Sequence, residues 1–218
     1  MSVLETRNLG ISFGGLQALD DIHFTIGEWE IIGLIGPNGA GKTTVFNLLT
    51  NVYVPSQGVI ELEGENIVGK KTYQITRNGI ARTFQNIRLF RDLSVADNVK
   101  IAMNSRMHYS VVSGIFHLSA SRREERMVSQ KTMELLQVFG LESSVDELAK
   151  ILPYGGQPKL EIARALATQP KVLLLDEPAA GMNPTETKEL METIRRIRDR
   201  FQVSILLIEH DMNFVMGI

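Results

Sequence analysis

The sequence predicts an α/β fold with a mainly parallel β-sheet, antiparallel β-strands near the N-terminus and an inserted helical subdomain. Short apolar runs alternate with helix-like segments, which is typical of strands joined by helices in a parallel sheet. From about residue 90 to residue 153 strand-like runs are replaced by helix-like sequence. We therefore expect a core made of residues 1–89 and 154–218, interrupted by a helical subdomain of residues 90–153.

The expected strands are apolar runs bounded by glycine, proline or polar turn residues. Ile22–Ile26 and Gly58–Gly64 alternate apolar and polar residues, as half-buried strands do. Glu30–Gly36, Lys171–Pro178 and Val203–His210 are nearly continuous apolar runs, which indicates buried strands. We expect Glu30–Gly36 to lie at the centre of the sheet.

The expected helices carry recognisable start and stop signals. Ser94–Val99 begins with a serine suited to cap a helix, and Ser121–Gly140 has an apolar stripe and a terminal glycine. A further helix is predicted from about Pro184 to Arg200.

The composition restricts the class of protein. The chain has 218 residues, of which 44% are hydrophobic and 22% charged, as in an ordinary globular protein. A net charge of −2 argues against a nucleic-acid partner, and the absence of cysteine excludes disulfides and cysteine-ligated zinc. Apolar runs such as Val172–Leu175 are far too short to span a bilayer, so a membrane role would need partner proteins.

The segment GPNGAGKTT, Gly36–Thr44, has the spacing of a phosphate-binding loop and lies between a predicted strand and a helical stretch. Glycines let backbone N–H groups surround a phosphate, Lys42 supplies a charge near the β- and γ-phosphates, and the Thr43 hydroxyl can bind Mg²⁺. The alternative is a glycine-rich turn that binds nothing, which this context disfavours. The nucleotide-binding residues expected here are Gly36, Pro37, Asn38, Gly39, Ala40, Gly41, Lys42, Thr43 and Thr44.

Two carboxylates follow a predicted buried strand. Ligands bind at the carboxyl ends of parallel strands, so Asp176 is a candidate for Mg²⁺ and Glu177 for polarising the attacking water. The alternative is a pair of solvated acids. His210 ends the next apolar run, where it could either donate a hydrogen bond to a γ-phosphate or have a structural role.

A second glycine turn, Gly155-Gly156, precedes an amphipathic segment that ends at Leu166. The unpaired N–H groups at the start of a helix attract anions. The sequence therefore predicts a second phosphate-binding position.

Taken in order, the phosphate loop, RTFQ with Gln85, PYGGQ, LLLDEP and LIEH resemble the ATP-binding subunits of ABC transporters. Gly155 lies 21 positions before Asp176, as in that family, and the resemblance covers essentially the whole chain. It implies a P-loop NTPase core, ATP and Mg²⁺ as cofactors, and ATP hydrolysis. It also implies that two ATP-binding subunits enclose each ATP between the phosphate loop of one and the glycine turn of the other.

The resemblance also implies roles for individual residues. Tyr154, Gly155 and Gly156 would hold the γ-phosphate of ATP bound by the partner. Gln85 would sense Mg²⁺ and the attacking water, and His210 would be the switch histidine. Phe13 would stack on adenine, the alternative being a core aromatic. The segment Asn86–Asn98 would contact the membrane subunit.

Some positions depart from the family's pattern. The usual signature is Leu-Ser-Gly-Gly-Gln, whereas here Pro153 and Tyr154 replace its second and third residues and Gly156 replaces its glutamine. Pro158 stands where a basic residue is usual, and Asn183 where aspartate is common. Family members normally continue well past the switch histidine, so we expect the C-terminal end to be truncated relative to the family.

Within the family, the motifs look most like ATPases that drive branched-chain amino acid import in prokaryotes. The implied partners are a second ATP-binding subunit, transmembrane permease subunits and, indirectly, a periplasmic or extracellular solute-binding protein. The implied location is the cytoplasmic face of the cell membrane. Relatives that serve urea, other amides or lipopolysaccharide share these loops, and a regulatory subunit that hydrolyses ATP weakly is a further alternative.

Two other classes fit less well. ABC-type ATPases of DNA repair carry long coiled coils or zinc-bearing inserts, whereas 66 residues without cysteine separate Gln85 from Leu152 here. The chain also lacks the Asn-Lys-x-Asp motif by which GTPases read guanine.

Overall fold

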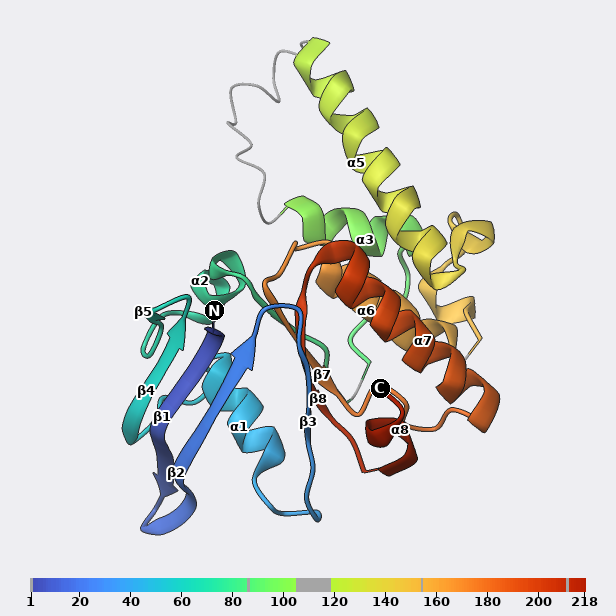
Figure 1. Cartoon of the computed structure of the whole chain (residues 1–218). Coiled ribbons are helices and arrows are strands. Elements are labelled where there is room, and N and C mark those ends of the chain that lie inside the picture. The colour runs from blue at the N-terminus through green and yellow to red at the C-terminus, as the bar shows by residue number, and fades with distance from the viewer. Residues whose placement is uncertain (1, 86, 105–118, 154, 211) are drawn as a thin grey trace. The chain divides into compact units, whose positions relative to one another are not determined.

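The structure is a computed structural model that describes residues 2–85, 87–104, 119–153, 155–210 and 212–218. Contacts divide the chain into two compact units, residues 1–86 with 169–218, and residues 87–168. The first unit contains both β-sheets, and the second is helical (Figure 1). The predicted α/β fold is therefore confirmed. The second unit is wider than the predicted subdomain of residues 90–153, and those domain bounds stay a prediction.

A parallel sheet forms one layer of the first unit. Its strands, in spatial order, are β3 (Ile31–Leu34), β8 (Ser204–Ile208), β7 (Val172–Asp176) and β6 (Ile80–Arg82). Every residue of β7 and β8 is buried, as their continuous apolar runs predicted.

The prediction of a buried central strand at Glu30–Gly36 was wrong in position. Among the described strands β3 pairs only with β8, so it lies at an edge, and its four residues are half-buried. A Cβ on Gly33 would lie 2.7 Å from a methyl group of Val215, which belongs to the short helix α8 (Met212–Met216). The apolar character of β3 thus serves packing at an edge.

The second sheet is antiparallel, with strands in the order β2 (Leu16–Gly27), β1 (Ser2–Phe13), β4 (Gln57–Leu62) and β5 (Glu65–Asn66). The predicted strand Ile22–Ile26 lies within β2, and the predicted strand Gly58–Gly64 overlaps β4 but extends two residues past its end at Leu62. Buried and exposed residues do not alternate regularly along β1, because its register against β2 shifts several times.

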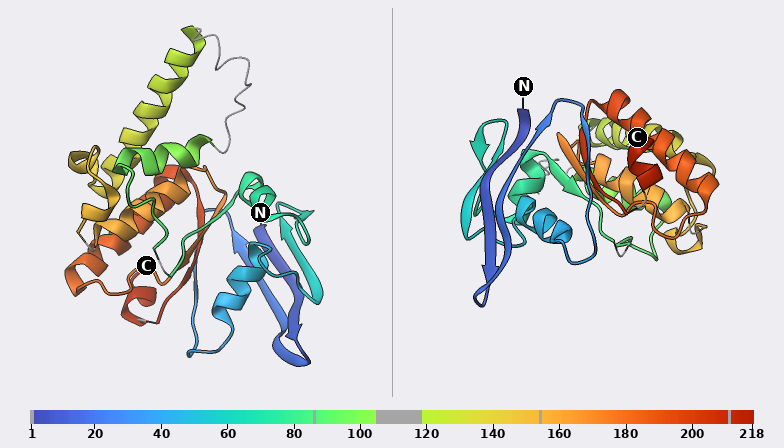
Figure 2. Two further views of the ribbon diagram at one scale, coloured as in Figure 1. Left: turned by 180° about the vertical axis from the view of Figure 1, so that it is seen from behind. Right: turned by 60° about the horizontal axis from the view of Figure 1, so that its bottom comes forward.

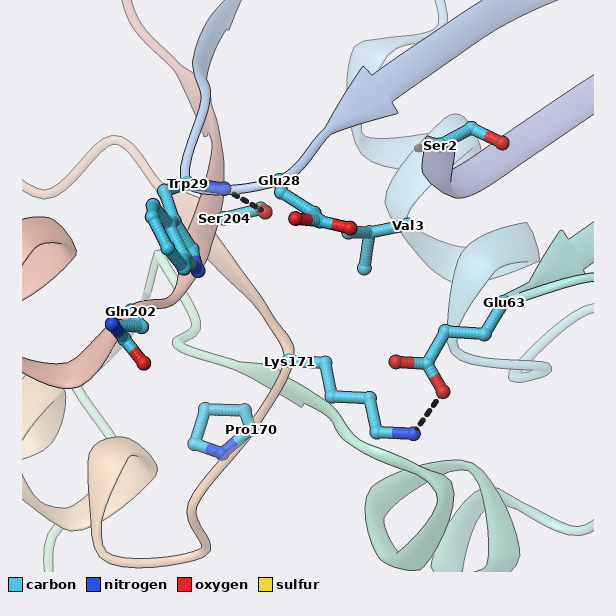
Figure 3. Close-up of a pocket in the computed structure, with 9 residues that line it drawn as sticks. All are labelled: Ser2, Val3, Glu28, Trp29, Glu63, Pro170, Lys171, Gln202 and Ser204. Carbon is cyan, nitrogen blue, oxygen red and sulfur yellow. Dashed lines mark hydrogen bonds and ion pairs between the residues drawn. The ribbon is translucent and has the colours of Figure 1, made fainter.

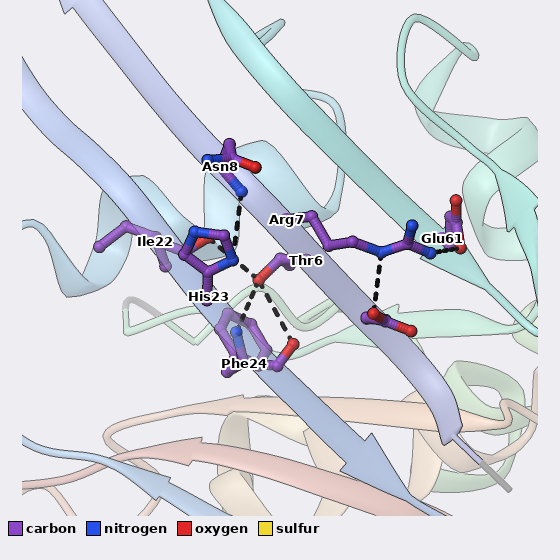
Figure 4. Close-up of polar contacts among 8 residues, drawn as sticks. Thr6, Arg7, Asn8, Ile22, His23, Phe24 and Glu61 are labelled. Atoms are coloured by element: carbon purple, nitrogen blue, oxygen red, sulfur yellow. Dashed lines mark hydrogen bonds and ion pairs between the residues drawn. The ribbon is translucent and has the colours of Figure 1, made fainter.

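One such shift lies between Thr6 and Leu9. There the hydroxyl group of the buried Thr6 forms hydrogen bonds with the backbone of the neighbouring strand β2 (Figure 4). Thr6 Oγ1 accepts a hydrogen bond from the Phe24 N–H at 3.0 Å and can donate to the Phe24 carbonyl at 3.4 Å. On the same strand Arg7 pairs with Glu5 and with Glu61 of β4. A side chain therefore satisfies backbone groups where the ladder is irregular.

Helix α1 (Lys42–Leu49) lies between the two sheets of the first unit in the different views (Figures 1 and 2). Its Phe46 and Leu49 are fully buried in a core that also takes Ile26 from the antiparallel sheet and Leu174 from the parallel sheet. The helix is therefore fixed by apolar packing on both sides, which sets the point at which the preceding loop ends.

Two further helices belong to the first unit, α2 (Thr72–Asn78) and α7 (Pro184–Phe201). Asn183 caps α7, since its side chain accepts from the N–H groups of Thr185 and Glu186 while Glu186 accepts from the Asn183 N–H. The predicted helix from Pro184 is confirmed, and it ends one residue later than expected.

The described residues of the second unit form α3 (Val95–Asn104), α5 (Ser119–Phe139), the 3₁₀ turns η1 (Glu142–Ser144) and η2 (Ala149–Ile151), and α6 (Gly156–Leu166). The predicted signals act as expected. Ser94 Oγ accepts from the Asp97 N–H at 3.0 Å, and Gly140 follows α5 with a φ of +68°. Nowhere in the described parts of the chain is a helix both long enough and apolar enough to cross a membrane.

Candidate nucleotide site

The carboxyl edge of the parallel sheet gathers most of the predicted site residues. The loop Gly36–Thr44 follows β3, His210 follows β8, Asp176 ends β7, and Gln85 follows β6. These positions all belong to the first unit. Residues scattered over the sequence thus meet at the edge where parallel sheets bind ligands.

The loop before α1 is shaped by glycine and by Lys42. Gly39 and Gly41 have φ values of +83° and +84°, and a Cβ on Gly41 would lie 2.6 Å from the Leu19 side chain. Lys42 Nζ donates to the carbonyl oxygens of Gly36 at 2.7 Å and Pro37 at 2.9 Å. An ammonium group has three N–H donors, so one remains for a phosphate.

The rest of the loop is open to solvent. Pro37, Asn38, Gly39 and Ala40 are exposed, Thr43 is exposed on the first turn of α1, and Thr44 is half-buried. The predicted phosphate contacts therefore lie on one accessible loop and the helix start behind it, where unpaired N–H groups favour an anion.

Glu177 is held by two of the predicted catalytic residues. Its Oε1 lies 2.6 Å from His210 Nε2, and its Oε2 accepts from Gln85 Nε2 at 2.9 Å. The backbone of Glu177 has a φ of +49°, uncommon for a residue with a side chain, and its N–H donates to the Ile208 carbonyl. The structure brings Gln85, Glu177 and His210 together.

Asp176 is almost fully buried at 4% exposure. Its Oδ2 accepts a hydrogen bond from Arg82 Nη2 at 2.7 Å, and its backbone N–H donates to Thr83 Oγ1 at 3.2 Å. Sequence reasoning missed Arg82. The signal was an arginine at the end of the apolar run GIAR.

Glu209 is a second residue that sequence reasoning missed, at 5% exposure. Its carboxylate accepts from the N–H groups of Ala179 at 3.0 Å and His210 at 3.3 Å. Burial raises the pKa of Glu209 above its ordinary value, and the two backbone hydrogen bonds partly oppose this. Glu209 therefore joins the loop after Glu177 to the histidine that contacts Glu177.

Phe13 lies at the end of β1 with 43% of its surface exposed, so it is not a core aromatic. Its ring meets Tyr53 edge to face, with 5.2 Å between centroids and 73° between planes. The predicted stacking on adenine stays a prediction.

The second glycine turn opens a helix, as the sequence predicted. Gly155 is buried and caps α6, which begins at Gly156, and the Gly156 N–H donates to the Pro153 carbonyl. This turn belongs to the second unit, and Tyr154 lies outside the described residues.

A pocket of about 550 Å³ lies elsewhere in the first unit (Figure 3). Pro170 and Lys171 precede β7, and Ser204 begins β8, so the pocket is at the amino ends of the strands. Lys171 pairs there with Glu63, and the Trp29 N–H donates to Ser204 Oγ. It is at the opposite edge from the predicted nucleotide site.

The donor set at the carboxyl edge fits Mg²⁺ bound together with phosphates. Thr43, Asp176 and Gln85 offer hydroxyl, carboxylate and amide oxygens, which suit a hard cation. Among the described residues no cluster of three or more His, Cys, Asp or Glu side chains could hold a metal by itself. That is expected where nucleotide phosphates complete the coordination.

Comparisons with known proteins agree with these features. Residues 19–180 match the sequence model of a family described as ABC transporter. This chain is 43% identical to the high-affinity branched-chain amino acid transport ATP-binding protein BraF of Pseudomonas aeruginosa and 44% identical to the protein of the same description, LivG, of Escherichia coli. Both alignments extend over 216 residues, which are 99% of this chain and 85% of each relative. The solved ADP conformation of MJ1267, an ATP-binding cassette of an ABC transporter, superposes with a TM-score of 0.85 at 29% identity, over 100% of this chain and 84% of that one.

Proposed function

The chain belongs to the ABC transporter family, and we propose that it is the ATP-binding and ATP-hydrolysing subunit that powers uptake of branched-chain amino acids in a prokaryote. The proposed solute is supported by the names of relatives that are 43% and 44% identical across 99% of the chain. In this proposal the solute is recognised by other subunits, since the present chain provides the energy.

The observation that carries the proposal is the grouping of Gln85, Glu177 and His210 beside the phosphate loop. Glu177 polarises the water that attacks the γ-phosphate, and it is oriented by the two contacts to its carboxylate oxygens. Lys42, held against the loop carbonyls, directs its remaining donor to the β- and γ-phosphates. His210 reports the presence of the γ-phosphate.

The proposed cation ligands are Thr43, Asp176 and Gln85. Mg²⁺ would neutralise charge on the phosphates when bound. Gln85 uses its amide nitrogen on Glu177, so its amide oxygen is left for the cation. Phe13, exposed beside Tyr53, provides a ring face for the adenine.

The proposed assembly pairs this chain with a second ATP-binding subunit. The phosphate loop of each subunit holds an ATP whose γ-phosphate also meets Tyr154, Gly155 and Gly156 of the other. Permease subunits, contacted through residues 86–98, would hold the pair at the cytoplasmic face of the membrane, and a solute-binding protein would act through them. Hydrolysis removes the shared phosphate and so separates the pair.

Leucine uptake tests the proposed function. In cells whose copy of this chain is deleted, the wild-type chain should restore uptake of radiolabelled leucine, and Glu177→Gln should not. The variant removes the group that polarises water, which typically contributes 10²- to 10⁴-fold to a rate. The purified wild-type chain should hydrolyse ATP in the same study. Restoration of urea uptake without leucine uptake would assign a different solute, and absence of ATP hydrolysis would contradict the enzymatic role.

A further inference from the structure

The Arg82 side chain is buried next to α1 and connects its own strand to two other elements of the first unit. It ends β6, its Nη2 donates to Asp176 Oδ2 of β7 at 2.7 Å, and its Nη1 donates to Asn47 Oδ1 of α1 at 2.7 Å. The side chains of the ion pair are 6% and 3% exposed. One guanidinium group therefore joins the strand that carries the acids to the helix that follows the phosphate loop.

The contact with Asn47 matters because of its place on α1. Asn47 lies four residues after Thr43, so the two side chains share a face of the helix one turn apart. Thr43 and Asp176 are two of the proposed cation ligands. The arginine thus connects Asp176 to the helix face that carries the hydroxyl ligand.

The orientation of the guanidinium leaves it little freedom. Its carbon lies 5.3 Å from the ring centroid of Phe46 and 5.1 Å from that of Phe84. Nε is buried without a hydrogen-bond partner, so the two Nη groups make the directional contacts. A planar fork with fixed spacing sets the distance between the two oxygens that it binds.

We propose that Arg82 is a positioning residue for the cation site: it holds the Asp176 carboxylate in one orientation and at a set distance from the Thr43 face of α1. The inference rests on the proposed role of Asp176 as a cation ligand. Because Arg82 occupies Oδ2, it turns Oδ1 away from itself and leaves that oxygen for the cation or its water.

A buried carboxylate with no partner would be costly to keep charged. Arg82 supplies an ion-pair partner for the buried Asp176 carboxylate. Lysine would keep the charge but cannot bridge the carboxylate and the Asn47 amide with the same fork. Arg82→Lys therefore tests the geometry while the positive charge is kept, and Arg82→Gln removes both.

The test measures nucleotide affinity with and without the cation. The dissociation constant of a non-hydrolysable ATP analogue is determined by calorimetry for the 218-residue chain, once with excess EDTA and once with excess Mg²⁺. The ratio of the two constants reports the contribution of Mg²⁺. The variants are Arg82→Lys, Arg82→Gln and Asp176→Asn, with Arg77→Gln, at an exposed position on α2, as the matched control. Circular dichroism and thermal unfolding verify that each variant is folded.

We expect Arg82→Lys and Arg82→Gln to lower the Mg²⁺ effect at least about tenfold, the range for partners that orient metal ligands, while the affinity in EDTA changes less than about twofold. Arg77→Gln should leave both constants unchanged. A normal Mg²⁺ effect in both Arg82 variants, with a lowered effect in Asp176→Asn, would overturn the positioning role alone. A normal effect in Asp176→Asn would instead overturn the cation role of Asp176 in the proposed function. If Arg82→Gln is unfolded, Arg82→Lys decides the matter.

Discussion

At the scale of single residues, the site depends on buried charged groups whose partners come from distant parts of the chain. Glu209 is an example, because its carboxylate accepts hydrogen bonds from the backbone N–H groups of Ala179 and His210. It ties Ala179, in the loop after Glu177, to His210. The raised pKa of Glu209 gives this contact a measurable pH dependence.

Glu209→Gln should change how stability depends on pH. The pKa of Glu209 is raised above its ordinary value of 4.5, so the folded chain binds this proton more tightly than the unfolded chain. Wild-type stability should therefore fall as the pH rises from about 4.5 through the raised folded pKa. Glutamine cannot titrate, so the melting temperature of the variant should rise relative to that of wild type as the pH increases across this interval. The loss of one hydrogen-bond acceptor should lower the melting temperature of the variant by the same amount at every pH.

Thermal unfolding from pH 4 to pH 8 checks this, with exposed Glu192→Gln as the control for removing a carboxylate. A difference between Glu209→Gln and wild type that is the same at every pH would contradict the prediction.

Phe13 gives a second prediction at this scale. Stacking of a base on an aromatic ring is worth about 1–3 kcal/mol, so Phe13→Ala should weaken ATP binding at least about fivefold, and Phe13→Tyr should not. Fluorescent ATP titration measures the change. Tyr73→Ala, which removes another exposed aromatic, should bind as wild type does. Equal affinity in Phe13→Ala would leave the ring without a role in nucleotide binding.

At the scale of elements, Gly156 departs from the family's usual glutamine without any steric need for glycine. Its φ is not positive, and an added Cβ would lie 3.6 Å from Leu152 and 3.8 Å from Leu141, which is ordinary contact. Gly156→Ala should therefore stabilise the start of α6 by about 0.5 kcal/mol, because alanine loses less conformational entropy on folding.

Gly140→Ala is the matched comparison. Gly140 also has room for a Cβ, but its φ of +68° strains a side chain, so this variant should lose about 1 kcal/mol. Chemical denaturation measures the free energy of unfolding of both variants, which should increase for Gly156→Ala and decrease for Gly140→Ala. A loss of stability in Gly156→Ala would show that the turn needs glycine for another reason.

The elements also show what local sequence can predict. β7 and β8 were found because continuous apolar runs reflect burial, and the phosphate loop because its spacing is local. The position of β3 was mistaken because a run of apolar residues does not reveal which strands pair with it. Pairing joins segments that are far apart in the chain, as when Ile31 of β3 pairs with Ile205 of β8.

The same limit applies to the site. Motifs identified Asp176, Glu177 and His210, but not their partners. Arg82 lies 94 positions from Asp176, and the contact of Gln85 with Glu177 spans 92. No periodicity or spacing encodes such distances, so Arg82 was missed and Gln85 was found only through family resemblance.

At the scale of the whole molecule, the two features predicted to bind phosphate belong to different units. The phosphate loop is in the first unit, and the helix start at Gly155 is in the second. A phosphate at the turn of another subunit would join two chains through ATP itself. Association should then depend on nucleotide and should be strongest when hydrolysis is blocked.

Light scattering of Glu177→Gln tests this dependence. Without nucleotide the chain should be a monomer of 24.3 kDa, and with ATP and Mg²⁺ a dimer of twice that mass. Adding Gly155→Trp should abolish the dimer, because a bulky residue at the buried helix cap covers the N–H groups that would meet the phosphate. ATP binding by a single chain should persist in that double variant, since Lys42 and its loop are unchanged. A chain that binds ATP tightly yet stays monomeric would contradict a sandwich of identical subunits, and the second phosphate contact would then have to come from a different ATP-binding subunit.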